Sequence, residues 1–141
     1  MSRLGLTALV ACYLWLRVAP AVAYTPEVEF ALNCQGCHLA DGAGTPDAGV
    51  PALADSVARF LAVPGGREYL IRVPGVAQAP LADATLAAVV SWMLGRFDAR
   101  HVPPDFRPYT ADEVRRLRAS PLVDVERVRA SLLAELERST R

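Results

Sequence analysis

The chain has 141 residues, of which 52% are hydrophobic, and its 15 basic residues are balanced by 15 acidic ones. That length holds one domain with an appendage rather than two full domains. The balanced charge excludes the usual kind of nucleic-acid-binding protein, which would carry a basic stripe.

The first 23 residues have the pattern of a secretory signal peptide. Arg3 supplies a positive charge, residues 4–16 are an apolar run, and Ala-Val-Ala at 21–23 fits a cleavage site before Tyr24. The apolar run is shorter than the roughly 20 residues of a membrane-spanning helix. The protein is therefore expected to be periplasmic. Two alternatives would tie it to a membrane: an uncleaved N-terminus, or a lipid on Cys12.

Residues 24–98 are predicted to form one all-α domain. Thr25 as N-cap and Pro26 in the first turn predict a helix that runs into Cys34. Loops rich in turn-forming residues are expected at 39–51 and 74–80. Between the loops lie a middle helix and a short helix, and Asp83 is expected to cap the helix after the second loop. The apolar positions that define these helices are Leu53, Val57, Phe60 and Leu61, then residues 67–73, then Leu86, Val89, Val90, Met93 and Phe97.

Residues 99–141 are predicted to form a linker and a two-helix C-terminal extension. Pro103 and Pro104 exclude a helix in the linker. Residues 110–113, Thr-Ala-Asp-Glu, form a capping box that opens the first helix. Ser120 and Pro121 are expected to open the second helix, whose apolar stripe is Val125, Val128, Leu132 and Leu136.

Residues 34–38, Cys-Gln-Gly-Cys-His, carry the C-x-x-C-H signature of covalent haem c attachment. Cys34 and Cys37, three apart at a helix end, can reach two vinyl groups of one porphyrin, and His38 can bind the iron between them. Gly36 leaves room for the backbone beside the ring. The alternatives are a disulfide, since an exported protein meets an oxidising compartment, and a zinc site, which would need a fourth ligand such as His101.

On these features, residues 26–97 resemble the class I mono-haem c-type cytochromes. The shared features are a first helix into C-x-x-C-H, a Gly-rich loop, Val-Pro-Ala-Leu at 50–53, a middle helix and a last helix carrying Trp92. The resemblance implies the cytochrome c fold, with a few helices around one covalently bound haem and His38 as the proximal ligand. It implies that Trp92 packs where the first and last helices cross. It also implies that the Pro51 carbonyl accepts a hydrogen bond from His38, although Pro51 could instead only shape its loop.

The sequence departs from this family at the distal side of the haem. The family usually supplies a distal methionine from the loop at 74–80, which here reads Pro-Gly-Val-Ala-Gln-Ala-Pro. Met93 is the first candidate for the sixth ligand, although a helical Met is more often core. His101 is the alternative. Gln78, the amine of Tyr24, water or an open site complete the possibilities.

The sequence thus predicts a periplasmic electron carrier and not an enzyme. It would pass one electron between a periplasmic dehydrogenase and a downstream acceptor, through redox partner proteins and with no nucleic acid. Residues 24–95 hold 3 arginines against 7 acidic residues, which favours partners with a basic or neutral face. The alternatives are a haem sensor or gas-binding protein with an open distal site, and a dedicated cytochrome subunit of one oxidoreductase. In that last case residues 110–138 would dock the enzyme rather than cover the haem domain.

Overall fold

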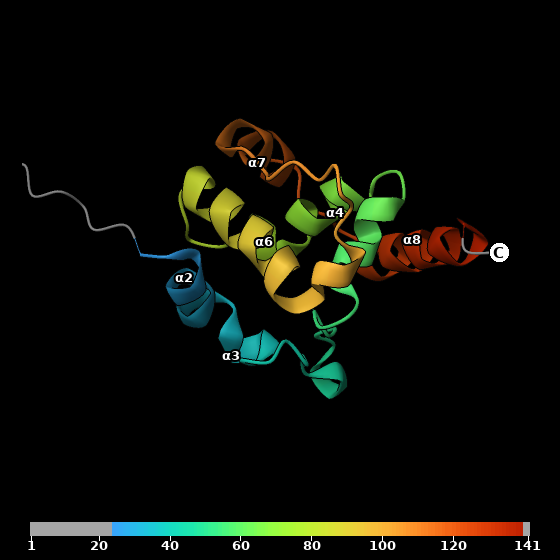
Figure 1. Ribbon diagram of the computed structural model, residues 1–141, viewed down its shortest axis with the longest axis horizontal. Helices are drawn as coiled ribbons and strands as arrows, with labels where there is room; N and C mark the ends of the chain where they lie inside the picture. Colours follow the sequence, from blue (N-terminus) through green and yellow to red (C-terminus); the bar gives the residue numbers. More distant parts are fainter. Residues whose placement is uncertain (1–23, 140–141) are drawn as a thin grey trace, which may run out of the picture.

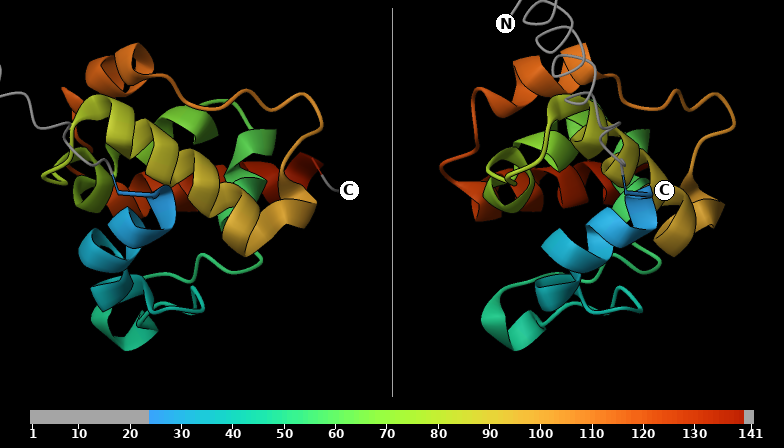
Figure 2. Two further views of the ribbon diagram at one scale, coloured as in Figure 1. Left: turned by 60° about the vertical axis from the view of Figure 1, so that its left-hand side comes forward. Right: turned by 90° about the vertical axis from the view of Figure 1, so that its left-hand side faces the viewer.

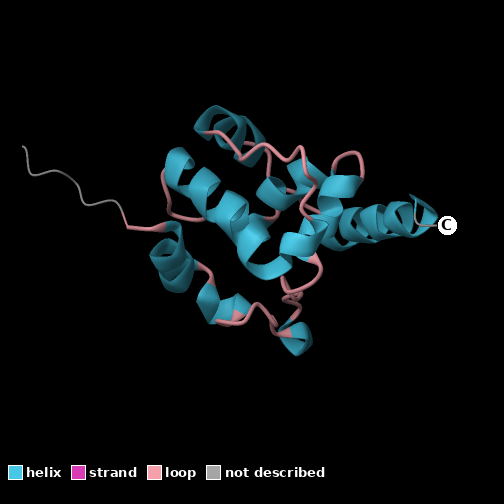
Figure 3. Ribbon diagram, in the orientation of Figure 1, coloured by secondary structure: helices cyan, strands magenta, loops and turns pink. Residues whose placement is uncertain are grey.

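The computed structural model describes residues 24–139, so the predicted signal peptide at 1–23 lies outside the described residues. Within that range the regular elements are all helices, which confirms the all-α prediction (Figure 3). Among the same residues no helix is both long and apolar enough to cross a membrane. The elements, with η marking 3-10 helices, are α2 (Pro26–Asn33), α3 (Gln35–His38), η1 (Pro46–Ala48), η2 (Val57–Ala62), α4 (Gly66–Arg72), α5 (Pro74–Ala77), α6 (Asp83–Asp98), η3 (Ala99–His101), α7 (Ala111–Arg118) and α8 (Val125–Ser139).

Helices α2 and α6 pack against each other, and this contact attaches the segment with the C-x-x-C-H motif to the rest of the molecule (Figure 1). Helix α2 begins as predicted, with the Thr25 hydroxyl accepting a hydrogen bond from the Val28 N–H at 3.4 Å. At the crossing, Phe30 is 2% exposed, and its ring centroid lies 5.0 Å from that of Phe97 and 5.6 Å from that of Trp92. The expected place of Trp92 is therefore confirmed.

Helix α6 does not begin as the sequence predicted. Its N-cap is Ala82, which has no side-chain cap, and Asp83 is the first helical residue. The Asp83 carboxylate instead lies 3.1 Å from a guanidinium nitrogen of Arg118 in the C-terminal extension. The Asp83 carboxylate therefore pairs with an arginine far along the chain instead of capping the helix locally.

The two segments before α6 also differ from the prediction. The middle helix is the 3-10 helix η2, and near its start the Ala58 N–H donates to the side chain of Asp98 at 2.8 Å. Residues 74–77 form the helical turn α5, closed by the Gln78 N–H donating to the Pro74 carbonyl at 3.0 Å, where a loop was expected. Proline suits the first turn of a helix because that turn needs no N–H from it.

The C-terminal extension packs on the preceding residues, with α7 against α6 and α4, and α8 against η2 and α4 (Figure 2). Val114 of α7 and both Leu132 and Leu136 of α8 are buried in the same core as α6. Helix α8 begins at Val125, later than predicted. The side chain of Asp124 accepts a hydrogen bond from the Arg127 N–H at 3.0 Å, as an N-cap does. Before it, the Leu122 N–H donates to the Arg72 carbonyl at 2.8 Å.

Candidate functional site

The C-x-x-C-H motif forms a short helical turn at the end of α2. The Cys34 N–H donates to the Phe30 carbonyl at 2.8 Å, and the N–H groups of Cys37 and His38 donate to the Cys34 carbonyl at 3.2 and 3.0 Å. Residues three and four apart in a helix lie on one face. The turn therefore brings both thiols and the imidazole to the same side of the motif segment.

Both cysteines are free thiols rather than a disulfide. Burial raises the pKa of the Cys34 thiol, and the neighbouring Cys37 raises it further. The motif thus presents two thiols one helical turn apart.

The imidazole of His38 is held in its neutral form. Burial lowers its pKa, and the backbone carbonyl of Pro51 partly offsets this effect by its interaction with the ring. The Nδ1 atom is buried and forms no hydrogen bond of good geometry. A neutral imidazole is the form in which histidine binds a metal, and Pro51 is placed to orient the ring.

Gly44 allows the loop after the motif to fold back on it. Its φ is +71°, and a Cβ at this position would lie 2.6 Å from the Pro51 oxygen. The Gly44 N–H donates to the His38 carbonyl at 3.1 Å, and the chain then turns through paired backbone hydrogen bonds between Thr45 and Val50. A side chain at 44 would be excluded by both sterics and backbone conformation, so this glycine sets the place of Pro51.

The candidate distal ligands lie outside this turn. Met93 is 7% exposed within the core on α6, and Gln78 is an exposed residue directly after α5. His101 lies beyond the end of α6, with its Nδ1 2.5 Å from an Asp98 carboxylate oxygen. His101 is therefore committed through one ring nitrogen and keeps only the other for a further partner.

Sequence reasoning missed the role of Asp98. Its side chain is fully buried, and its two oxygens contact His101 and the Ala58 N–H. The sequence held a signal, because Asp98 stands four residues after Leu94, which is fully buried. An acidic residue in a buried helical position predicts an internal hydrogen-bond partner.

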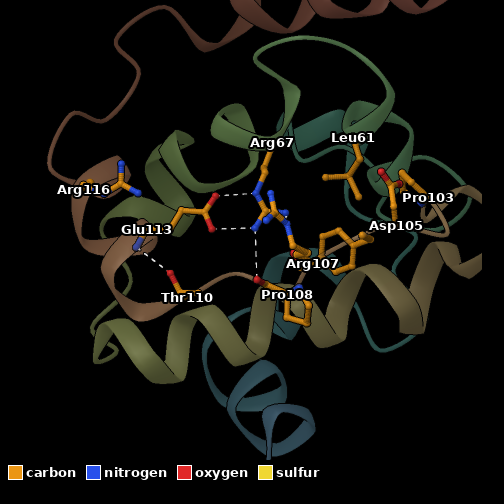
Figure 4. Close-up of a pocket in the computed structure, with 10 residues that line it drawn as sticks. Leu61, Arg67, Pro103, Asp105, Arg107, Pro108, Thr110, Glu113 and Arg116 are labelled. Atoms are coloured by element: carbon orange, nitrogen blue, oxygen red, sulfur yellow. Dashed lines mark hydrogen bonds and ion pairs between the residues drawn. The ribbon is translucent and has the colours of Figure 1, made fainter.

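A separate cavity of about 470 Å³ lies on the α4 and α7 side of the molecule (Figure 4). It is crossed by the bidentate pair of Arg67 and Glu113, whose nitrogen–oxygen distances are 2.6 and 2.8 Å. The guanidinium of Arg67 also stacks 4.0 Å from the Tyr109 ring centroid. In Figures 1 and 2 this side lies across α6 from α3, so the cavity is not part of the motif site. The rest of its lining is Leu61, Pro103, Asp105, Phe106, Arg107, Pro108, Thr110 and Arg116.

The motif residues fit a haem. Two unpaired thiols and a neutral, half-buried imidazole occupy one helical turn, and no atom from outside that turn lies within 4 Å of where a Cβ on Gly36 would be. The donor set is the one that thioether attachment and axial ligation of a haem iron require.

Two proteins named cytochrome c-552, both from Thermus thermophilus, are similar to this chain. One is 38% identical over 121 residues, covering 72% of this chain and 80% of the relative. The other is 41% identical over 109 residues, covering 64% of this chain and 82% of the relative. No protein-family model matches the sequence.

The alignment lengths and coverages show that the relatives carry additional residues inside the matched region. Since 72% of 141 residues is about 102, about 19 of the 121 aligned positions have no counterpart in this chain. The second relative gives the same difference, because 64% of 141 is about 90 of 109 positions. With an all-α fold, a C-x-x-C-H turn that fits a haem and two relatives of this name, the chain belongs to the class I c-type cytochromes, haem proteins that carry electrons.

Proposed function

We propose that this cytochrome is a periplasmic one-electron carrier that holds one haem covalently, through thioethers at Cys34 and Cys37, with His38 as the proximal iron ligand. The observation that carries the proposal is the helical turn that presents two free thiols beside a neutral imidazole. Export through residues 1–23 is the remaining part of the proposal, and it predicts a mature N-terminus at Tyr24.

The haem, when bound, supplies the one-electron chemistry of its iron. The chain's own residues orient and shield it. Pro51 lies beside the His38 ring, where its carbonyl would fix the ring orientation and raise the basicity of the ligand. The apolar side chains of α2 and α6, among them Phe30, exclude water from the side on which the segment with the C-x-x-C-H motif packs. Axial ligand, burial and hydrogen bonds to that ligand are the means by which a protein sets a haem potential.

The face around the motif suits a basic or neutral redox partner. Residues 24–58 contain no Arg or Lys and carry five acidic residues, Glu27, Glu29, Asp41, Asp47 and Asp55. Val28 and Leu32, four apart on α2, are exposed, as is Leu39 next to the motif. An apolar surface with acidic residues around it attracts a partner of opposite charge and packs against its apolar centre. We expect electron transfer to such a partner to slow as ionic strength rises.

Haem staining after denaturing gel electrophoresis tests covalent attachment. The full chain is expressed for export in a host with a haem-maturation system, and its band should stain for haem peroxidase activity. The double variant Cys34→Ala with Cys37→Ala should be exported without stain, while Gln35→Ala, inside the same motif, should stain like wild type. A wild-type band that loses its stain on denaturation would contradict the proposal.

A gas-binding or sensing function is the second candidate, and the distal side favours it. Residues 74–80 contain no methionine, His101 is engaged with Asp98, and Met93 is packed in the core.

For the electron carrier, we propose Met93 as the sixth ligand of the iron, which predicts a weak far-red sulfur-to-iron band in the oxidised protein. Met93→Leu should abolish that band and admit carbon monoxide to the reduced iron, whereas His101→Ala should keep it. A high-spin wild-type protein that binds carbon monoxide rapidly would instead support the second candidate.

A further inference from the structure

The C-terminal end of helix α6 holds the loop that follows the C-x-x-C-H motif. The Asp55 N–H donates to the Phe97 carbonyl at 3.1 Å, and the Ala58 N–H donates to the Asp98 carboxylate at 2.8 Å. The Phe97 ring closes against Gly42, where a Cβ would lie 2.6 Å from a ring carbon. Two consecutive residues of α6 therefore fix the loop at three points.

The loop is also tied to itself between these points. The Gly42 carbonyl accepts hydrogen bonds from the N–H groups of Leu53 at 2.7 Å and Ala54 at 3.1 Å. The Ser56 hydroxyl donates to the Ala52 carbonyl at 2.7 Å. A displacement at one end of residues 52–58 is therefore passed to the other end.

Pro51 directly precedes this tied stretch and contacts the motif. Its carbonyl interacts with the His38 ring, and its oxygen lies 2.6 Å from where a Cβ on Gly44 would be. The Gly44 N–H in turn donates to the His38 carbonyl at 3.1 Å. A continuous path of contacts thus runs from Asp98, at the end of α6, to the imidazole of the motif.

Asp98 is the buried anchor of this path. One carboxylate oxygen accepts from the Ala58 N–H, and the other lies 2.5 Å from His101 Nδ1. A buried carboxylate is costly unless it is hydrogen-bonded, and an apolar side chain would fill this place without that cost. Ala58 is 0% exposed, so water cannot replace the contact. The position of Ala58 therefore depends on this one carboxylate.

We propose that Asp98 is a positioning residue for the proximal side of the haem. Through Ala58 and the tied loop it holds the Pro51 carbonyl beside the His38 ring, and so sets how strongly the imidazole binds the iron. This inference rests on the proposed function, in which His38 is the proximal ligand. A hydrogen bond at the other ring nitrogen makes an imidazole a more basic ligand, and a more basic ligand favours ferric iron. Loss of Asp98 should therefore raise the reduction potential.

The test compares Asp98→Ala, Asp98→Asn and Arg100→Gln in the exported, haem-loaded full chain. The reduction potential and the hydrogen exchange of residues 51–58 are measured. Asp98→Ala should speed exchange and shift the ratio of reduced to oxidised protein by about two- to tenfold toward the reduced form, the effect of one weakened hydrogen bond. Asp98→Asn keeps an oxygen for the Ala58 N–H and should stay near wild type. Arg100→Gln removes only an exposed pair with Asp55 on the same loop and should change neither quantity.

The asparagine variant separates position from charge. Both Asp98 variants lose the negative charge, so equal shifts in their potentials would make the effect electrostatic and overturn the inference. A shift accompanied by loss of the far-red band would place the effect at the sixth ligand and overturn it as well. Val114→Ala, which truncates a buried side chain of α7, should lower stability without moving the potential. Asp98→Ala that behaves in the same way would show a structural role alone.

A variant nearer to Pro51 keeps the inference testable if Asp98→Ala does not accumulate. Ser56→Ala removes the hydrogen bond to the Ala52 carbonyl without changing any charge. It should also raise the potential, and a wild-type potential would overturn the inference, because the loop would then pass nothing to His38. Failure of the proposed function is seen separately, as a wild-type chain without covalent haem stain.

Discussion

Residues 24–58 and residues 59–139 are held together by different kinds of interaction. The first segment has no Arg or Lys, and apart from Phe30, Leu53 and Val57 its large apolar side chains are not buried. The second segment holds most of the core and is cross-linked by arginines that reach 35 to 48 residues along the chain. Aromatic contacts of Phe30 and two hydrogen bonds donated by backbone N–H groups, from Asp55 to Phe97 and from Ala58 to Asp98, join the two.

This difference indicates which of the two segments needs the haem in order to fold. A segment with few buried apolar groups has low local stability on its own, whereas the second segment has a core and long-range cross-links. Ligands that bind only the folded state add their binding free energy to its stability. We therefore expect the motif segment, and not the C-terminal half, to depend on the cofactor.

The largest expected effect is on the haem-free chain. In the variant Cys34→Ala with Cys37→Ala, hydrogen exchange in α2 and the loop at 39–51 should approach the rates of an unfolded chain, while α4 and α7 stay protected. Exchange measured peptide by peptide on the haem-loaded and haem-free proteins checks this. Equal loss of protection in both segments would contradict the expectation that only residues 24–58 depend on the haem.

Next in size is the effect of Phe30→Ala, which removes the main apolar contact between the two segments. Truncating a buried aromatic side chain costs about 3–5 kcal/mol, so the unfolding free energy should fall by that order. Val28→Ala, two residues away on the exposed side of α2, is the control and should change stability by less than about 0.5 kcal/mol. Denaturant unfolding of the haem-loaded variants measures both, and equal effects would mean that α2 is not anchored through Phe30.

A smaller effect is expected from Glu113→Gln within the second segment. The hydrogen bond from Arg67 lowers the pKa of Glu113 in the folded state, so the ionised carboxylate stabilises the fold above its unfolded pKa of about 4.3. This contribution is lost as the pH falls from there through the lowered folded pKa. The variant should be less stable than wild type by about 1 kcal/mol at pH 7 and no less stable once the pH is below both pKa values. A difference that persists undiminished at low pH would show that the pair does not stabilise the fold through its charge.

The smallest effect is expected from Arg100→Gln. Arg100 pairs with Asp55 across the two segments at 2.7 Å, but both side chains are more than 60% exposed. Exposed ion pairs contribute about 0–1 kcal/mol and are screened by salt. Thermal unfolding at low and high ionic strength should hardly separate this variant from wild type. A loss as large as that of Phe30→Ala would mean that surface charge, rather than buried contact, joins the segments.

The sequence predicted the features that depend on neighbouring residues. The Thr25 cap, the helical turn at residues 34–38 and the Thr110 cap of α7, whose hydroxyl accepts from the Glu113 N–H at 3.2 Å, all follow from residues within one turn. In the capping box only that half formed, because the Glu113 carboxylate is bound to Arg67.

The features that the sequence did not predict depend on distant partners. The hydrogen bond from the Ala58 N–H at the start of η2 goes to Asp98, forty residues later, and the Leu122 N–H before α8 donates to the carbonyl of Arg72 in α4. Arg118 looks in the sequence like one more helix-ending cation, yet it holds the α5–α6 link. In the site, the helical turn at residues 34–38 depends on neighbouring residues, whereas the place of Pro51 depends on the loop that folds back at Gly44.

Mass spectrometry of the purified, trypsin-digested protein tests the central claim most directly. Residues 24–58 contain no Arg or Lys, so trypsin should release Tyr24 to Arg59 as one peptide with both cysteines and His38. The account predicts that this peptide carries the mass of one haem after denaturation and reduction, with every other peptide unmodified. A peptide 24–59 recovered as two free thiols, with its haem lost on denaturation and reduction, would contradict it.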